Sequence, residues 1–203
     1  WNDDTRFGPE GLIFIYRNQI YVTGNAGSRS TGANNNTDLS TPTLLPVAGT
    51  APSGWSQIAA NVGSACALSN VGTVYCWGPN GVGQLGQGDT TSRYQATQVN
   101  IPNGGAQIRK IITNSIPTYS SYDGQESYFA IDGNGNVYAW GYNAQGVLGN
   151  GNQTNQSTPV RVNSGPWASV DIRKIVISSS DGGSPHGAAI DSTGQLWTWG
   201  RNG

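Results

Sequence analysis

Short stretches in which apolar side chains alternate with polar ones cover most of this 203-residue chain, and glycine-rich stretches separate them. Successive side chains of a β-strand point to opposite faces, so this period of two predicts strands, and no stretch shows the period of a helix. The clearest stretches are four related phrases that end in glycine, at 20–24, 74–78, 137–141 and 196–200.

Two further sets of strands accompany this phrase. Segments 108–112 and 172–176 share the sequence Ile-Arg-Lys-Ile, and 55–59 is a weaker counterpart. Apolar strands also come just before the glycine-ending phrase, joined to it by short linkers that signal a β-hairpin. These strands are 66–69, 129–132 and 188–191. Each unit is therefore predicted to hold a strand, a hairpin, a long glycine-rich connection and a final short strand.

The final glycines of the phrase recur at intervals of roughly 54 to 63 residues, a period typical of β-propellers and related radial arrays. The fuller pattern V-Y-x-W-G-x-N-x-x-G-x-L-G-x-G, closed by P-x-x-V, resembles the regulator of chromosome condensation repeat family. The resemblance covers roughly 11–203, and the first copy is degenerate because Thr23 replaces tryptophan. It implies a seven-bladed propeller with four antiparallel strands per blade. The repeated residues, which we interpret as structural, are Trp77, Gly78, Trp140, Gly141, Trp199 and Gly200.

The predicted fold class is all-β: a β-propeller-like array of about four repeat units, each a four-stranded antiparallel blade, incomplete as a closed propeller. Residues 1–203 form one repeat array. Its approximate units are 1–49 (degenerate and partial), 50–103, 104–165 and 166–203 (truncated). Seven blades of this period would need roughly twice the length. We therefore expect either part of a larger propeller or closure by pairing with another chain through open blade edges.

The composition argues against two classes of function. With a formal charge of −1 and 10% charged residues, the chain lacks the excess of positive charge that nucleic-acid binding requires. No apolar run is long enough for a signal peptide or membrane insertion. The chain opens on Trp1 and contains no methionine, so we expect that a leader has been removed or that a longer chain surrounds it.

The two cysteines flank a predicted hairpin. Cys66 and Cys76 are symmetric about Val71, the middle of the turn, so they should lie opposite each other and can form a disulfide. The alternative is a pair of buried free thiols in an intracellular protein. With a single histidine, His186, in the chain, no metal site is predicted. A disulfide would place the protein outside the cytosol.

No catalytic residue and no cofactor are predicted. Residues 132–136 resemble the opening of a calcium loop, but they coincide with a hairpin turn, which explains them. His186 occupies the position of Ser64 and Ser127 in the other units, where the family carries a buried structural histidine. Glycosylation patterns at Asn35, Asn152 and Asn155 fall in connections that should be exposed.

The candidate binding residues lie where the units differ. The connection between the first two strands is longest at 114–124, and insertions at one position of successive repeats gather on one face. It contributes Tyr119, Tyr122 and Asp123, a mixture suited to a protein or glycan ligand. Arg93 and Tyr94 in another connection are a second choice, and a solvated loop without function is the alternative.

These features favour a non-enzymatic extracellular propeller that serves in binding or adhesion, or as a subunit of a cell-surface assembly or filament. The second hypothesis is a regulatory protein-binding propeller. For this the resemblance implies guanine-nucleotide exchange or enzyme inhibition, although no acidic or wedge-like loop for exchange is identified. An enzyme with its site in the propeller channel lacks a recognisable catalytic constellation.

Overall fold

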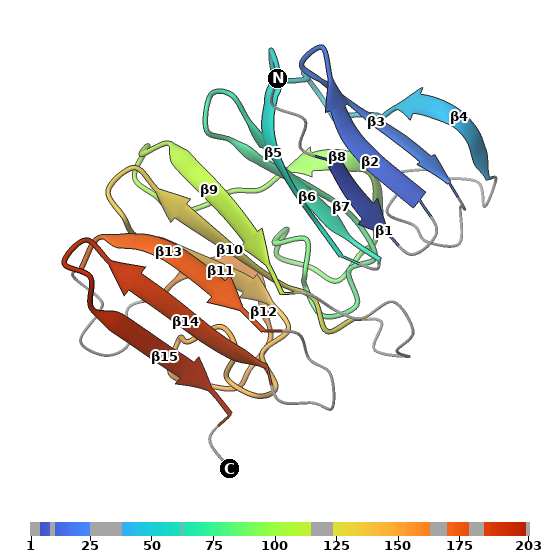
Figure 1. Cartoon of the computed structure of the whole chain (residues 1–203). Coiled ribbons are helices and arrows are strands. Elements are labelled where there is room, and N and C mark those ends of the chain that lie inside the picture. Colours follow the sequence, from blue (N-terminus) through green and yellow to red (C-terminus); the bar gives the residue numbers. More distant parts are fainter. Residues whose placement is uncertain are drawn as a thin grey trace.

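The computed structural model describes residues 5–8, 11–24, 38–61, 63–114, 124–162, 170–178 and 185–201. In these ranges all the regular secondary structure is β-strand, arranged as four antiparallel sheets that we refer to as blades 1 to 4 (Figure 1). Blade 1 contains β1 (Thr5–Gly8), β2 (Gly11–Tyr16), β3 (Gln19–Gly24) and β4 (Leu39–Leu44); blade 2 contains β5 (Trp55–Ala60), β6 (Ala65–Ser69), β7 (Val74–Gly78) and β8 (Arg93–Gln98). Blade 3 contains β9 (Ile108–Thr113), β10 (Ser127–Asp132), β11 (Val137–Gly141) and β12 (Gln156–Arg161), and blade 4 contains β13 (Ile172–Ile177), β14 (His186–Asp191) and β15 (Leu196–Gly200).

The predicted fold class is confirmed. Strands follow chain order within each blade, and the blades succeed one another from the N-terminal to the C-terminal end of the array (Figure 1). Neighbouring blades approach each other along their first strands, with β1 near β5, β5 near β9 and β9 near β13. None of the described residues belongs to a helix able to cross a membrane.

The two central strands of blades 2 and 3 are buried on both faces because their alternating side chains pack against two different blades. We define the leading face of a blade as the face toward the next blade and the trailing face as the face toward the previous one. In blade 2 the leading face carries Cys66, Leu68, Val74 and Cys76, which share a core cluster with Tyr128 and Trp140 of blade 3. The trailing face carries Ala65, Ala67, Tyr75 and Trp77, which share a cluster with Ile13, Ile15, Ile20 and Val22 of blade 1. The hydrophobic core is therefore a series of interfaces between blades.

The repeated tryptophans join successive blades. Trp140 Nε1 donates a hydrogen bond to the carbonyl oxygen of Gln84, 3.0 Å away in the connection of blade 2. Trp199 Nε1 does the same to Val147 in the connection of blade 3, at 2.6 Å. Each of these indoles thus satisfies its buried N–H group in the preceding blade, as buried tryptophan requires.

A glycine at one point of each of these connections makes the approach of the indole possible. Gly86 has φ +69°, and a Cβ atom there would lie 3.0 Å from Val99 Cγ1 and 3.1 Å from Trp140 Cδ1. Gly149 has φ +70° and would meet Trp199 Cδ1 at 3.0 Å. Glycine is required at both positions for the left-handed backbone and for the missing side chain.

Candidate functional site

The predicted disulfide forms within the leading face of blade 2. Cys66 and Cys76 are directly opposite on β6 and β7, with an S–S distance of 2.05 Å and no exposed surface. The same two positions hold Ile13 and Val22 in blade 1. The cross-link therefore takes the place of an apolar cross-strand pair, and its role in the array is structural.

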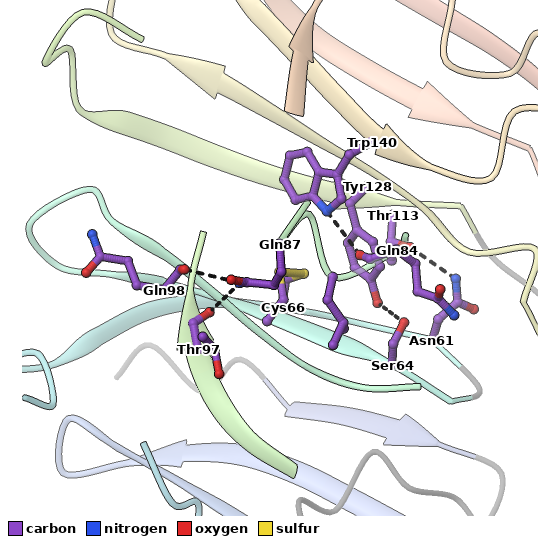
Figure 2. Close-up of a disulfide and its surroundings, with 12 residues drawn as sticks. Asn61, Ser64, Cys66, Gln84, Gln87, Thr97, Gln98, Thr113, Tyr128 and Trp140 are labelled. Atoms are coloured by element: carbon purple, nitrogen blue, oxygen red, sulfur yellow. Dashed lines mark hydrogen bonds between the residues drawn. A yellow bond between two sulfur atoms is a disulfide. The ribbon is translucent and has the colours of Figure 1, made fainter. Parts of the chain in front are cut away.

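A buried polar network lies beside the disulfide between blades 2 and 3 (Figure 2). The hydroxyl groups of Ser64 and Tyr128 are 2.9 Å apart, and Asn61 Nδ2 donates to Thr113 Oγ1 at 3.0 Å. Gln84 Nε2 donates to Glu126 Oε2 at 3.0 Å. Burial, with a smaller contribution from the Glu126 charge, raises the pKa of Tyr128 well above its ordinary value. These groups hold the two blades together and offer no paired acid and base facing a cavity.

The segment that resembles a calcium loop is a hairpin turn. Asp132 is fully buried, and its Oδ1 accepts hydrogen bonds from the backbone N–H groups of Asn134 and Asn136, each at 2.9 Å. Asp191 makes the equivalent turn in blade 4, where its Oδ2 accepts from Trp197 Nε1 at 2.9 Å. Because these carboxylate oxygens already have partners, the turn explanation is confirmed. The described part of the chain holds no group of three potential metal ligands.

Arg93, one of the candidate binding residues, is bound within its own blade. Its guanidinium contacts both carboxylate oxygens of Asp89, at 2.9 and 2.7 Å, and donates to the Thr91 carbonyl at 2.8 Å. The hydrogen bond from Arg93 is the main reason that the pKa of Asp89 lies well below its ordinary value. Arg93 therefore ties the start of β8 to the preceding connection of blade 2 through Asp89 and Thr91. Its neighbour Tyr94 is half-buried.

Tyr119, Tyr122 and Asp123 lie outside the described residues, so the candidate site in that connection stays a prediction. Of the glycosylation patterns, the Asn152 and Asn155 positions are exposed, as expected, and Asn35 lies outside the described residues.

The leading face of blade 4 carries three of the six large apolar side chains that are exposed among the described residues. Val176, Ile190 and Leu196 are 52%, 41% and 57% exposed. In blade 2, the counterparts of the last two, Leu68 and Val74, are 3% and 1% exposed. An open hollow of about 690 Å³ lies at one end of this face. An apolar surface that is buried in the other blades and exposed here marks a site for a further protein surface.

His186 lies at this hollow, and its predicted burial is wrong. Ser64 and Ser127, which hold the same position in blades 2 and 3, are fully buried and hydrogen-bonded. His186 is exposed because no described residue covers the leading face of blade 4. The sequence pattern identifies the position correctly, but burial there depends on a following blade.

Comparisons with known proteins identify the repeat. The model of the regulator of chromosome condensation (RCC1) repeat matches residues 71–113 and 134–179. Human E3 ubiquitin-protein ligase HERC2 is 31% identical over 129 residues, which is 64% of this chain and 2% of that protein. The ultraviolet-B receptor UVR8 of Arabidopsis thaliana is 28% identical over 182 residues, which is 90% of this chain and 37% of the receptor.

Two solved structures show the same fold. The crystal structure of human WBSCR16 has a TM-score of 0.69 and 21% identity, and the match covers 98% of this chain and 47% of WBSCR16. Yeast RCC1 (Prp20), crystallised with Kap60, has a TM-score of 0.69 and 18% identity, with 97% and 43% covered. The chain thus spans less than half the length of each of these four proteins.

Proposed function

Because the chain is built from regulator of chromosome condensation repeats, we propose that it is a non-enzymatic, regulatory protein-binding array that engages a protein through the leading face of blade 4. The exposed apolar face carries this proposal. The partner would need a surface like the trailing face of a blade, whose aromatic side chains pack against the leading face of the blade before it. Structures of yeast RCC1 give protein partners for a relative: one shows it bound to Kap60, and another concerns its binding to Gsp1p and histones.

The chain itself carries one surface of the required kind. The trailing face of blade 1 presents Tyr21, the counterpart of Tyr75 and Tyr138, stacked on Phe14 with ring centroids 5.7 Å apart. Both rings are half-buried. A second copy can therefore supply a trailing face to blade 4, and head-to-tail association is the simplest test of the binding face.

Light scattering coupled to size exclusion, across a concentration series, measures this association. We expect the wild-type chain to associate reversibly, and both Leu196→Asp and Tyr21→Asp to be monomeric. An equimolar mixture of the two variants should form a heterodimer, since one retains an intact trailing face and the other an intact leading face. Val71→Asp is the matched control, because Val71 is 51% exposed in the turn between β6 and β7 of blade 2.

The mixture of the two variants distinguishes specific pairing of the two faces from non-specific hydrophobic association. Wild-type association with no recovery in the mixture would mean that the two faces do not recognise each other. A wild-type chain that stays monomeric at every concentration, with Leu196→Asp behaving identically, would remove the support for a binding role of this face.

For the compartment, we propose an oxidising environment such as the cell exterior, supported by the Cys66–Cys76 pair. Thiol titration of protein isolated from its native source under denaturing, alkylating conditions tests it. Two reactive thiols would place the protein in a reducing compartment, whereas none would support secretion.

A further inference from the structure

The only two lysines of the sequence occupy the same position in blades 3 and 4. Lys110 lies on β9 and Lys174 on β13, and each directly follows an arginine. Both strands are the first of their blade, so one side of each is an edge that no strand of the same blade pairs with. A strand edge presents unpaired N–H and C=O groups that another chain can bind.

The structure shows how such an edge is closed in the neighbouring interface. Gln57, the counterpart of Lys110 on β5, donates through Nε2 to the Ile111 carbonyl at 2.8 Å. Its Oε1 accepts from the Ile111 N–H at 3.0 Å. One amide side chain of blade 2 therefore satisfies both backbone groups of Ile111 at the edge of blade 3.

The edge of β13 lacks this closure. Ile175 pairs with Ala189 in the register in which Ile111 pairs with Ala130, so its N–H and C=O groups point toward the same edge. Lys110 occupies the place of Gln57 there, and an ammonium group has donors only, so it cannot accept the Ile175 N–H. Among the described residues, no side chain bonds to the Ile175 backbone at this edge.

The charges around this edge are unbalanced. Asp171 is shared by Arg109, at 3.2 Å, and Arg173, at 2.7 Å. Neither lysine has a carboxylate partner among the described residues. Two arginines therefore share one carboxylate, and the two lysines add two further positive charges, in a chain whose formal net charge is −1.

We propose that the free edge of β13, flanked by Lys110 and Lys174, binds an extended acidic segment of a partner protein. A carbonyl of that segment accepts the Ile175 N–H, as in strand addition to a sheet edge, and its carboxylates pair with the two ammonium groups. This inference rests on the proposed protein-binding function. It uses the backbone edge of β13 rather than the apolar side chains of the leading face of blade 4, and Lys174 lies directly opposite Ile190 beside that face.

The test is fluorescence anisotropy with a labelled ten-residue peptide of alternating glutamate and valine at low salt. Loss of one exposed ion pair should weaken binding about two- to five-fold, so Lys174→Gln should have an effect in this range. Lys110→Met should also fall in this range, because it removes the charge and leaves the edge open. Lys110→Gln should weaken binding more than Lys110→Met, because glutamine can close the Ile175 edge as Gln57 closes that of Ile111.

Arg161→Gln, a charge change at an exposed position on the outer strand β12, is the matched control and should bind like the wild type. No binding by the wild type, or an equal loss in Arg161→Gln, would overturn the proposal. A single-stranded oligonucleotide of the same charge that binds with the same lysine dependence would overturn it in favour of a nucleic-acid site. Tyr21→Asp, a variant of blade 1 that should not self-associate, should bind the peptide normally, which separates failure here from failure of the association through the blade 4 face.

Discussion

Replacing Gly86 by alanine tests the packing of the interface between blades 2 and 3. The substitution places a Cβ atom 3.0 Å from Val99 Cγ1 and 3.1 Å from both Cδ1 and Nε1 of Trp140. Trp140 is fully buried and tied to the Gln84 carbonyl, and Val99 is 4% exposed, so neither side chain can withdraw freely. The new methyl group must therefore push the indole away from its hydrogen-bond acceptor or distort the connection.

Two costs add at this position. The left-handed φ of +69° costs an alanine about 1–2 kcal/mol, and inserting a methyl group into a packed core costs about 1–3 kcal/mol. The free energy of unfolding should therefore fall by about 2–5 kcal/mol. Gly104→Ala isolates the first cost, because Gly104 has φ +62° and nothing lies within 4 Å of its Cβ position. It should lose only about 1–2 kcal/mol.

Urea unfolding measures both variants, followed by tryptophan fluorescence for the interface and by far-ultraviolet circular dichroism for the strands. The expected result is a lower midpoint for Gly86→Ala than for Gly104→Ala, at an unchanged slope. Equal losses in the two variants would refute the reasoning, because they would show that the indole does not need the space at Gly86.

Three further predictions concern the disulfide and two surface turns. Replacing Cys66 and Cys76 by alanine removes a cross-link between residues ten apart and should lower the free energy of unfolding in urea by about 2–4 kcal/mol, while a thiol reductant should destabilise only the wild type. Hydrogen bonds from Thr193 and then Trp197 lower the pKa of Asp191 from 3.8 to about 2, so its contribution to stability is complete above the ordinary value and is lost as the pH falls toward the folded one. Asp191→Asn should flatten this part of a stability series in acid, and an unchanged pH dependence would contradict the assignment. Arg93→Gln should raise the pKa of Asp89 toward its ordinary value. An NMR titration measures this, and the pKa of Asp191 should stay unchanged as the control.

The fold could be predicted from sequence because its determinants are local and repeated. The alternation in the V-Y-x-W strands gives the two buried faces, and glycines such as Gly86 recur at the same distance from each phrase. The pairing of the two cysteines could be predicted in the same way, since Cys66 and Cys76 are equidistant from the turn. None of these inferences needs knowledge of how one blade meets another.

The candidate site was harder to predict from sequence, because its features depend on contacts between blades or within irregular connections. Arg93 is a candidate ligand by residue type, but its bidentate contact with Asp89 becomes visible only when the connection is folded. The exchange of Gln57 for Lys110 can be found by aligning the first strands of the units. Its meaning is not in the alignment, because the edge that Gln57 closes belongs to the next blade.

The way in which blades meet has a consequence for how such chains change in length over evolution. Every interface joins the leading positions of one blade to the trailing positions of its successor, so all units carry the same pair of complementary surfaces. A gene duplication that copies one whole unit inserts a blade whose two faces already match its new neighbours. The apolar contacts of such an insertion are therefore already provided, whereas unit-specific polar residues such as Gln57 and Lys110 determine whether the new strand edges are closed.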